Sequence, residues 1–491
     1  MGYAIASGHI ATTQAAEEVL RAGGNAVDAA IAAFTVAWVA EPCMASAGGG
    51  GFAITRVNGD PVLLFDFFCQ TPRIKKPAEE SDFFPIVVDF GATRETFHVG
   101  LGATAVPGAI AGVFALHERY GRMPIRELLQ PAIEAAAHGV EINRFQYEGA
   151  RLLESILRLH PRGRTLFLRN DRLAAVGDRL HFPQMADYLD HLGREGRDAF
   201  YRGEVARKIA ADHESGGGYL HLADLEAYRV IVREPLAFTY RGLRFYTNPL
   251  PSTGGTRLTL GLKKLEERKA LPPLHSGEQV RSLYSVFRYL ETIGFQAADL
   301  ARAMEVVPLS DHLPKWGSTT HISVVDNRGN AVGLTATNGE GSGYFVEGTD
   351  IQLNNMLGEA ALQPLGFHSW QPDTRLSSLM APTIWLDAEG NFQGVTGSSG
   401  AGRIPNALLQ VVHYLVDHGL EVQAAVDRPR VHGQEGVLYL EPGLELSGWD
   451  GAVERFDAPS LFFGGAHTVV RQAGRLFAAA DRRREGLGVA G

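Results

Sequence analysis

The chain has 491 residues, of which 45% are hydrophobic, so it is long enough for one large domain or two to three ordinary domains with a substantial core. Its formal net charge is −9 and its basic residues are scattered along the chain, which argues against a nucleic-acid-binding groove. Two cysteines, Cys43 and Cys69, are too few for a disulfide framework or a thiolate metal site, and we expect both to be structural thiols.

The N-terminal part predicts a strand over residues 3–10, followed by two helices. Gly23 and Gly24 interrupt the helical pattern, and Asn25 restarts it as an N-cap. The apolar stretch that begins at Ala26 contains an aspartate and is too short and alanine-rich to span a bilayer, so it predicts a core helix and no membrane partner. The N-terminus lacks the features of a signal peptide, which predicts a cytoplasmic location unless the chain has been trimmed.

A run of four glycines at residues 48–51 leads into a predicted hairpin whose turn lies at 58–59. No Gly-Lys-Ser/Thr follows the run, and it enters a strand rather than a helix, so close backbone packing fits it better than a phosphate-binding loop. Helical periodicity dominates residues 106–208, and a second helical block spans 278–304. Residues 306–318 are rich in Pro, Gly and Ser and predict an exposed connector.

Residues 319–337 predict a β-hairpin that begins with a Thr-Thr-His triplet and turns at 327–330. Because side chains on a strand alternate between its two faces, Thr319, His321 and Ser323 share one face. An ordinary polar strand end also explains this pattern on its own, since β-branched residues are common in strands. The rest of the chain has to decide between the two interpretations.

Beyond the hairpin, strands are predicted over 383–397 and 466–481, with a helix over 406–419 between them. Strands and helices therefore occur in blocks along the whole chain. This order predicts an α+β protein with two stacked sheets covered by helices.

Motifs spread over nearly the whole chain occur in the order found in one enzyme family. The chain resembles the γ-glutamyltranspeptidase family of N-terminal-nucleophile hydrolases in the motifs GGNAVDAAIA, GGGGF, VPGAIAG, TTHISVVDNRGNAV, LNNM, LSSLMAPT and TGSSGAGRI. The resemblance implies a four-layer αββα sandwich and a proenzyme that cuts its own chain between Ser318 and Thr319. It implies a large-subunit region over 1–318 and a small-subunit region over 319–491, which together form one catalytic domain without a metal ion or cofactor.

Thr319 is the nucleophile that this resemblance implies. A threonine hydroxyl is a weak nucleophile until a base removes its proton, and an N-terminal threonine carries such a base in its own α-amine, whose ordinary pKa is about 8. Thr319 therefore has to become a chain end. Thr337, across the hairpin, matches the family threonine whose hydroxyl supports the nucleophile, although it is also an ordinary strand residue. We expect His321 to be a hydrogen-bonded structural histidine rather than a base.

Further site residues follow from the other family motifs. Gly400 and Ala401 lie between a predicted strand and a predicted helix, so we expect their backbone N–H groups to face a developing oxyanion. Ser377 and Ser378 match the serine pair that binds the α-carboxylate of the substrate, although such a pair is also common in turns. Glu359 stands where the family usually has an aspartate that binds the substrate ammonium group.

The chain departs from the family pattern in the residues that recognise the substrate. Gly339 replaces the family asparagine two residues after the supporting threonine, and we expect Asn338 to substitute for it. The family segment Asp-Phe-Arg-Glu reads DFFC over 66–69, and the downstream arginine that clasps the glutamyl carboxylate has no clean equivalent. Arg73 and Arg94 are the candidates to replace it.

The resemblance favours a γ-glutamyltransferase or glutathione hydrolase, which transfers the acyl group of a small γ-glutamyl amide to Thr319 and then to water or an amino acid. A second hypothesis keeps this machinery but changes the acyl group, as in the acylase and oxamate-amidohydrolase relatives, and the altered segment 66–69 supports it. A third is an uncleaved binding relative, which the intact Thr319, Thr337 and Gly400 disfavour. The expected protein partners are the two subunits of one precursor, and further oligomerisation is left open.

Overall fold

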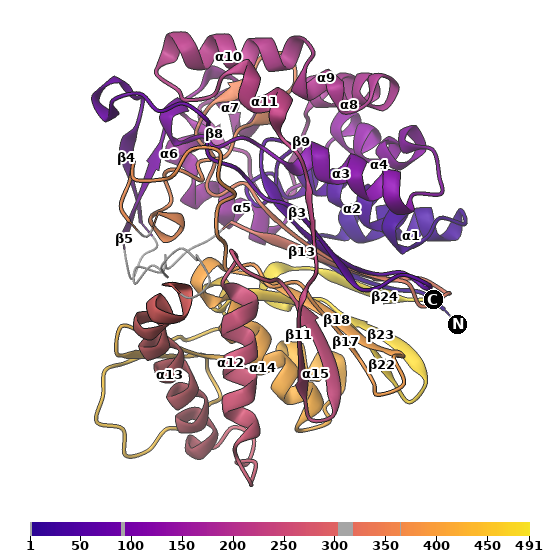
Figure 1. Ribbon diagram of the computed structural model, residues 1–491, viewed down its shortest axis with the longest axis vertical. Coiled ribbons are helices and arrows are strands. Elements are labelled where there is room, and N and C mark those ends of the chain that lie inside the picture. The colour runs from indigo at the N-terminus through magenta and orange to yellow at the C-terminus, as the bar shows by residue number, and fades with distance from the viewer. Residues whose placement is uncertain (1, 90–93, 303–317, 364) are drawn as a thin grey trace.

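The computed structural model describes residues 2–89, 94–302, 318–363 and 365–491. Two antiparallel sheets pack face to face, and a layer of helices covers the outer face of each sheet (Figure 1). From top to bottom of this view the layers are helices, sheet, sheet and helices. The predicted α+β fold with a four-layer αββα sandwich is confirmed.

The first sheet holds the predicted hairpin at its centre. Its strand order is β10-β3-β2-β14-β13-β1-β24, and every neighbouring pair is antiparallel. The strands are β1 (Ala4–Ser7), β2 (Gly50–Arg56), β3 (Leu63–Phe67), β10 (Ile231–Arg233), β13 (Thr320–Val325), β14 (Ala331–Thr337) and β24 (Leu487–Ala490). Because β24 pairs with β1, the two ends of the chain lie side by side (Figure 1).

The second sheet combines strands from both halves of the chain. Its order is β11-β12-β17-β18-β22-β23, again with antiparallel neighbours only. The strands are β11 (Leu236–Tyr240), β12 (Leu243–Thr247), β17 (Thr383–Leu386), β18 (Phe392–Ser399), β22 (Gly465–Gln472) and β23 (Arg475–Ala479). The regions expected to become the large and small subunits thus share both sheets.

The helices divide between the two outer layers (Figure 1). Those on the side of the first sheet are α1 (Ile10–Arg21), α2 (Ala26–Ala40), α3 (Ala109–Tyr120), α4 (Ile125–His138), α5 (Arg144–Leu152), α6 (Glu154–Leu157), α7 (Pro161–Phe167), α8 (Pro183–Glu195), α9 (Asp198–Tyr201), α10 (Glu204–Gly216) and α11 (Leu222–Ala227). Those on the side of the second sheet are α12 (Gly254–Glu266), α13 (Gly277–Arg302), α14 (Ile404–Val416) and α15 (Val422–Asp427).

Shorter elements complete the described chain. The small strands are β4 (Phe84–Asp89), β5 (Arg94–Val99), β6 (Val140–Glu141), β7 (Leu168–Arg169), β8 (Arg172–Leu173), β9 (Arg179–Leu180), β15 (Phe345–Val346), β16 (Ile351–Gln352), β19 (Val431–Gln434), β20 (Val437–Leu440) and β21 (Val453–Arg455). The 3-10 turns are η1 (Ala78–Glu80), η2 (Leu101–Ala103), η3 (Ala360–Leu362), η4 (Ala401–Arg403), η5 (Leu461–Phe463) and η6 (Arg482–Arg484).

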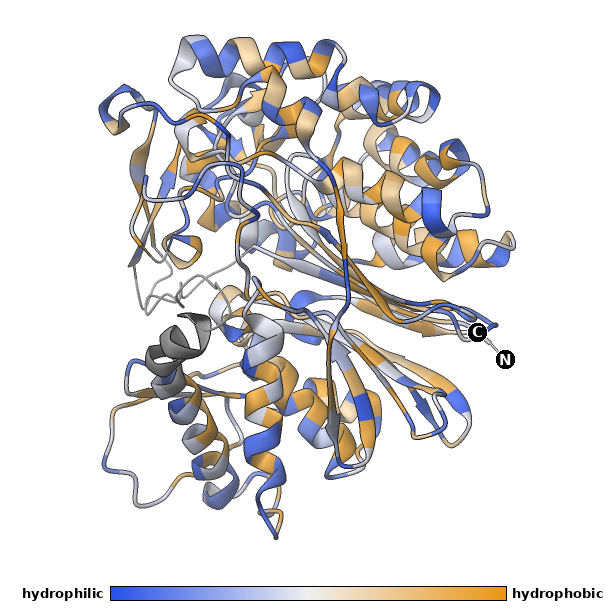
Figure 2. Ribbon diagram, viewed as in Figure 1, coloured by the Kyte–Doolittle hydropathy of each residue, from blue (hydrophilic) through white to orange (hydrophobic). Residues whose placement is uncertain are grey.

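Helix α2 is the predicted core helix, and all of its residues are buried. It begins at a capping box, in which the Asn25 side chain accepts from the backbone N–H groups of Val27 and Asp28 while Asp28 accepts from Asn25. The helix packs against the first sheet, α1 and α4, which explains why it is apolar all round (Figure 2). No helix in the described part of the chain has the length and apolar character needed to cross a membrane.

The glycine run at residues 48–51 brings backbones together, as the sequence predicts. A Cβ at Gly49 would lie 2.3 Å from the Thr337 carbonyl oxygen, and a Cβ at Gly51 would lie 2.4 Å from the Thr335 carbonyl oxygen. Only glycine allows β2 to approach β14 this closely. The run therefore shapes the wall beside Thr337 instead of cradling a phosphate.

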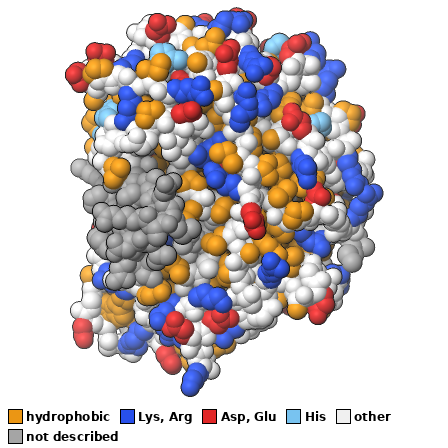
Figure 3. Space-filling view, in the orientation of Figure 1, with side chains coloured by type: hydrophobic (Ala, Val, Ile, Leu, Met, Phe, Trp, Pro, Cys, Tyr) orange, Lys and Arg blue, Asp and Glu red, His pale blue; other side chains and the backbone are white. Residues whose placement is uncertain are grey.

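Two sequence predictions concern regions at the limits of the described chain. The connector predicted over 306–318 lies outside the described residues except for Ser318. The helical block predicted over 278–304 is described as α13, which ends at Arg302. On the face shown in Figure 3, acidic and basic side chains are interspersed, in line with the scattered basic residues of the sequence.

Candidate active site

The hairpin of β13 and β14 places Thr319 across from Thr337. Thr320 pairs with Ala336 in an antiparallel register, so the residue before Thr320 lies opposite the residue after Ala336. Thr319 is 5% exposed and Thr337 is 8% exposed, and the two therefore meet at a nearly water-free end of the first sheet. The hairpin predicted over 319–337 is confirmed.

The Thr337 hydroxyl contacts the peptide bond that is expected to be cut. It donates a hydrogen bond to the Ser318 carbonyl oxygen, and it accepts one from the Gly339 backbone N–H at 3.0 Å. A donor at this carbonyl withdraws electron density from its carbon and stabilises negative charge on its oxygen. The arrangement can therefore polarise the bond between Ser318 and Thr319.

His321 is bound within the first sheet, and Ser323 links it to the second sheet. Its Nδ1 lies 2.7 Å from Thr335 Oγ1, and its Nε2 lies 2.9 Å from Ser323 Oγ. Ser323 donates in turn to the His467 carbonyl oxygen of the second sheet at 3.0 Å. Burial, with a smaller contribution from His467, holds the pKa of His321 well below its usual value, so the ring is neutral. These contacts fit the structural role that the sequence predicts.

Strand β18 of the second sheet runs over the hairpin. Ser323 Oγ lies 3.4 Å from the Val395 carbonyl oxygen, and a Cβ at Gly397 would lie 2.1 Å from His321 Nδ1. Positions 395 and 397 of β18 thus lie over positions 323 and 321 of β13, so the two strands run in opposite directions. The C-terminal end of β18 consequently lies over the start of β13, and Gly400 follows at that end.

Gly400 and Ala401 turn the chain from β18 into η4 and α14. Their φ angles are 112° and 47°, in the left-handed region. A Cβ at Gly400 would lie 2.8 Å from Gly464 Cα, so only glycine fits there. Among the described residues, no backbone or side-chain acceptor receives a hydrogen bond from either amide. Both N–H groups are therefore available at the end of the strand that covers the hairpin.

Two glutamates lie next to Gly339. A Cβ on Gly339 would lie 2.3 Å from Glu359 Oε1 and 2.1 Å from Asn355 Oδ1, so the absence of a side chain lets the Glu359 carboxylate reach this position. Asn355 Oδ1 accepts from the Glu340 backbone N–H at 2.8 Å, and Asn355 Nδ2 donates to Glu340 Oε2 at 3.4 Å. Sequence reasoning missed Glu340, although an acidic residue in a glycine-rich turn just after Thr337 was a usable signal.

The two carboxyl groups hold their protons more firmly than ordinary glutamates. Burial raises the pKa of Glu340, and the nearby Glu359 charge raises it further. Burial raises the pKa of Glu359 to about 8, because its carboxyl points inward even though the residue is partly exposed. A cation bound between them would favour their ionised forms, so this corner of the site suits an ammonium group.

The other predicted binding residues are engaged within the protein. Asn338 is buried, with its Nδ2 donating to a backbone carbonyl at 3.4 Å, while its Oδ1 has no partner among the described residues. The Ser377 hydroxyl donates to the Pro251 carbonyl at 2.8 Å. The Ser378 hydroxyl accepts from the Met380 backbone N–H at 3.1 Å. Binding a carboxylate through these serines would require their hydroxyls to exchange partners.

The serine loop and the DFFC segment reach the same end of the first sheet as Thr337. The Leu376 N–H donates to the Cys69 carbonyl at 3.1 Å. A Cβ at Gly50 would lie 2.9 Å from the Cys69 backbone nitrogen, and Gly50 pairs with Thr337. Segments that are far apart in the sequence therefore converge around the hairpin end.

The structure places Arg73 at the surface rather than beside the buried Thr319. Its side chain is 44% exposed, and its guanidinium pairs with Asp373 at 3.3 Å. The side chain of Arg94, the other candidate, lies outside the described residues. Phe68, at the position of the arginine in the family segment Asp-Phe-Arg-Glu, is buried and stacks on Phe52 with ring centroids 5.5 Å apart. An apolar wall thus stands where that segment has its arginine.

Sequence reasoning also missed Arg375, a buried arginine that supports this wall. Its guanidinium donates to the Phe68 carbonyl and the Tyr228 hydroxyl, and to the Arg229 carbonyl at 2.6 Å. Asp66 lies 3.6 Å away and supplies the opposite charge. The position of Arg375, directly before the Leu-Ser-Ser motif, was the available signal. Its bonds to the Phe68 and Arg229 carbonyls hold two backbone segments together, which fits a supporting role.

Neither a disulfide nor a metal cluster appears in the part of the chain that the structure describes. Cys43 and Cys69 are both free and buried, and burial raises the pKa of Cys43 to about 12, so its thiol stays protonated. The described His, Cys, Asp and Glu side chains form no group of three or more that could hold a metal ion.

Comparisons with known proteins agree with this architecture. The family model for γ-glutamyltranspeptidase matches residues 12–305 and 291–491. The chain is 30% identical over 474 residues to a glutathione hydrolase proenzyme of Escherichia coli, covering 88% of this chain and 80% of that one. It is 30% identical over 482 residues to an acylase ACY 1 proenzyme of a Pseudomonas strain, covering 90% and 84%.

A solved structure supports the fold independently. The crystal structure of a cephalosporin acylase from Bacillus halodurans superposes with a TM-score of 0.84 at 22% identity and covers 99% of this chain and 95% of that chain. The family model spans both regions of the chain. The chain belongs to the γ-glutamyltranspeptidase family.

Proposed function

We propose that the protein is a self-cleaving γ-glutamyltransferase or glutathione hydrolase that works through Thr319 as an N-terminal nucleophile. The observation that carries the proposal is the pair at the hairpin end, where Thr319 lies opposite Thr337 and the Thr337 hydroxyl holds the Ser318 carbonyl. The proenzyme relatives named above support a precursor that yields two subunits from one chain. Its substrate would be a small γ-glutamyl amide.

In the proposed maturation, the Thr319 hydroxyl attacks the Ser318 carbonyl carbon. The new C–O bond gives a tetrahedral oxyanion, which collapses as the C–N bond breaks, and the proton of the Thr319 hydroxyl passes to the departing nitrogen, which becomes the α-amine of Thr319. Water then hydrolyses the ester, which leaves a carboxylate on Ser318 and restores the hydroxyl. The Thr337 hydroxyl would stabilise the oxyanion of the first step, with the Gly339 N–H polarising it.

In the proposed turnover, the freed α-amine takes the proton of the Thr319 hydroxyl as it attacks the amide carbonyl of the substrate. The amides of Gly400 and Ala401 would stabilise the resulting oxyanion. The amine product leaves with a proton, and water or an amino acid then attacks the acyl-enzyme ester. Glu359 would hold the substrate ammonium group, and Ser377 and Ser378 its carboxylate.

Denaturing electrophoresis with N-terminal sequencing tests the proposal. The wild-type protein is expected to give two chains, the smaller beginning Thr-Thr-His, and Thr319→Ala is expected to remain one inactive chain. Thr320→Val is the matched control, because the Thr320 hydroxyl donates to Glu41 at 2.7 Å and away from the scissile bond. A wild-type protein that is fully active while uncut would contradict the mechanism.

A second candidate is an amide hydrolase for a non-glutamyl acyl group. Phe68 at the position of the arginine in the family segment Asp-Phe-Arg-Glu, with Arg73 turned to the surface, favours it. The acylase relative at 30% identity is consistent with this choice. Comparing kcat/KM for γ-glutamyl-p-nitroanilide and for anilides of uncharged acyl groups separates the two candidates, since a preference for an uncharged acyl group would favour the acylase.

A further inference from the structure

The proposed oxyanion loop, residues 399–403, packs against a second turn of the chain, residues 462–464. A Cβ at Gly464 would lie 2.5 Å from the Ser399 carbonyl oxygen, and a Cβ at Gly400 would lie 2.8 Å from Gly464 Cα. Ala401 keeps a φ of 47°, which non-glycine residues rarely adopt and which the surroundings must therefore hold in place. The backbone around Gly464 is the nearest support for this conformation.

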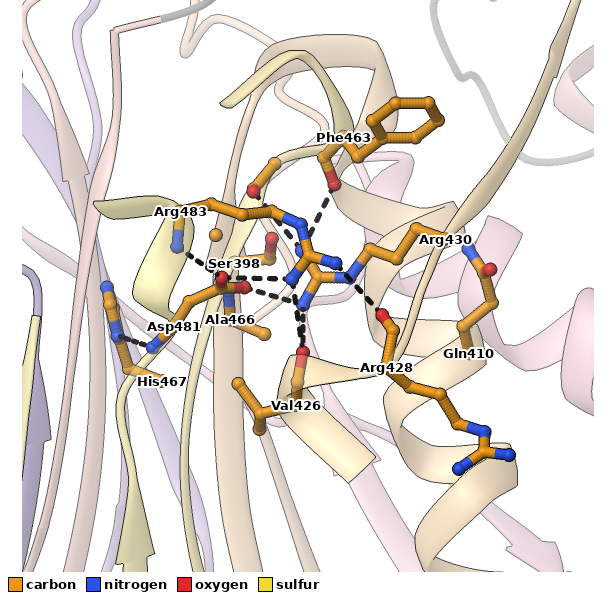
Figure 4. A network of polar contacts seen from close by, with 12 residues as sticks. Ser398, Gln410, Val426, Arg428, Arg430, Phe463, Ala466, His467, Asp481 and Arg483 are labelled. Atoms are coloured by element: carbon orange, nitrogen blue, oxygen red, sulfur yellow. Dashed lines mark hydrogen bonds and ion pairs between the residues drawn. The ribbon is translucent and has the colours of Figure 1, made fainter. Parts of the chain in front are cut away.

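Arg430 binds this turn from behind (Figure 4). The residue is 1% exposed, and its Nη1 donates to the carbonyl oxygens of Phe463 at 3.2 Å and Gly464 at 3.1 Å. Its Nη2 donates to the Val426 carbonyl at 3.1 Å and to Asp481 Oδ2 at 2.6 Å. One guanidinium thus joins the support of the loop to the end of α15 and to a buried carboxylate.

Asp481 fixes the position of Arg430 and of the start of β22. The same Oδ2 accepts from the Ala466 N–H at 3.0 Å, and Oδ1 accepts from the Arg483 N–H at 3.0 Å and pairs with the Arg483 guanidinium at 3.1 Å. The cations of Arg430 and Arg483 and the backbone donors keep the pKa of Asp481 well below its usual value despite burial. The carboxylate is therefore ionised at neutral pH.

Two further groups hold the 462–464 turn: Glu441, which binds the chain just before it, and Arg403, which belongs to the oxyanion loop. The Glu441 carboxylate accepts from the Ser460 N–H at 3.0 Å and from the Arg430 N–H at 2.8 Å. Arg403, at the end of the oxyanion loop, donates from Nε to the Phe462 carbonyl at 2.8 Å and lies over the Phe462 ring at 4.6 Å. Loop and turn are consequently locked together by charge-assisted hydrogen bonds in a buried region.

We propose that Arg430 is a positioning residue, which with Asp481 fixes the 462–464 turn and through Gly464 fixes the amides of Gly400 and Ala401 where the substrate oxyanion develops. The inference rests on the proposed function, because it takes those amides as the oxyanion donors. The planar guanidinium serves three carbonyl oxygens and a carboxylate at the same time. A lysine has only three donors on one nitrogen and cannot reproduce this set of contacts.

Arg430→Lys tests the proposal when kcat and KM are measured per active site, titrated by the burst of acyl-enzyme formation so that uncleaved chains do not count. We expect kcat to fall on the order of tenfold to a hundredfold with KM within about twofold, because a displacement of about 1 Å in a catalytic group has effects of this size. Asp481→Asn should give a smaller loss of the same kind, and it serves as the second variant if Arg430→Lys does not fold.

A matched control separates positioning from general stability. The Asp417 side chain is only 2% exposed and pairs with Arg241 at 2.6 Å, but it lies beyond the far end of α14 from the oxyanion loop. Asp417→Asn is expected to lower Tm and to leave kcat unchanged. If Arg430→Lys behaves in the same way, with a lower Tm and an unchanged kcat, its role is only structural and the proposal is overturned.

A double-mutant cycle that combines Arg430→Lys with Gly400→Ala tests whether Arg430 acts on the oxyanion loop through the contact between Gly464 and Gly400. A methyl group on Gly400 would push the loop off Gly464, so the combined variant is expected to lose clearly less than the product of the two separate losses in kcat. Multiplicative losses would overturn the proposal, because Arg430 would then act by another route. If Gly400→Ala alone keeps full turnover, the amides of Gly400 and Ala401 are not the oxyanion donors. The inference about Arg430 then fails as well, because it depends on that assignment.

Discussion

Two regions meet at the candidate site and are built in different ways. The region around Thr319 and Thr337 is made of paired strands, with its key contacts set by backbone register and by one short hydrogen-bonded chain. The region around Glu359 and Phe68 is made of side chains from loops and strand ends that are distant in sequence. The first region keeps the family pattern, and the second departs from it at several positions.

This difference indicates that the paired strands determine the type of reaction and that the loops determine the choice of substrate. Acyl transfer needs a nucleophile, a base and oxyanion donors in fixed geometry, and paired strands supply such geometry. Recognition of the acyl group depends on which charges face it, and loop substitutions can change these charges while the strands stay in place. Removing groups from each region should therefore produce losses of different kinds.

The largest loss is expected from Thr337→Val, which keeps the shape and removes the donor to the Ser318 carbonyl. Self-cleavage should slow on the order of a hundredfold or more, because one oxyanion donor is lost. The rate is measured as the appearance of the Thr319 chain on denaturing gels. The control is Thr396→Val, because the Thr396 hydroxyl lies 2.7 Å from the hydroxyl of Thr468 on the neighbouring strand of the second sheet, away from the scissile bond. Equal cleavage rates in wild type and Thr337→Val would remove Thr337 from the maturation step.

Gly400→Ala is expected to lower kcat on the order of a hundredfold, since its methyl group would collide with Gly464 and shift both proposed oxyanion amides. Ala401→Gly is the control, because glycine adopts a φ of 47° without strain and keeps the N–H. Proline, which lacks the N–H, cannot adopt this φ and would displace the whole loop. If alanine at 400 leaves kcat unchanged, the oxyanion donors lie elsewhere.

Glu359→Gln should affect binding instead of chemistry. Loss of a hydrogen bond from a charged group costs about 1.5 to 3 kcal/mol, or about one to two powers of ten in kcat/KM for γ-glutamyl-p-nitroanilide. The glutaryl anilide, which lacks only the amine, should be spared, and Glu359→Asp should restore part of the lost activity. Equal losses on both anilides would make Glu359 a structural residue, and a wild-type preference for the glutaryl compound would favour the acylase alternative.

The smallest expected effect is a slope of stability with pH. Because the pKa of Glu359 is raised from 4.5 to about 8, the folded protein binds its proton more firmly than the unfolded chain does. This contribution is complete below pH 4.5 and is lost as pH rises towards about 8. Denaturant unfolding across this window should show a smaller fall in unfolding free energy for Glu359→Gln than for wild type. Parallel slopes would contradict the raised pKa.

Much of the fold could be predicted because its signals are local. Asn25 as an N-cap, the alanine-rich helix after it and the hairpin over 319–337 all appear in the structure as expected. Each depends on periodicity or capping within a few residues, and tertiary packing reinforced these preferences. The glycine run at 48–51 was also predicted to pack closely against backbone, which its contacts with β14 bear out.

The recognition residues could not be predicted with the same success. Nothing in the sequence near Arg73 indicated that its guanidinium would pair with Asp373 at the surface, 300 residues further along the chain. Arg375 and Glu340 were missed because their contacts are with residues far along the chain or around a turn. Such contacts depend on how loops pack, and local patterns carry little information about it.

The sequence by itself determined the kind of protein: strand and helix periodicity specified two sheets between helix layers, and the Thr-Thr-His hairpin with its accompanying motifs specified the family. Only the tertiary structure decided which groups meet. It placed Gly464 under Gly400, Arg430 behind Gly464 and Glu359 against Gly339. The physical reason is range, because secondary structure follows from interactions over a few residues, whereas the charge and shape of a site follow from side chains that only folding brings within hydrogen-bonding distance.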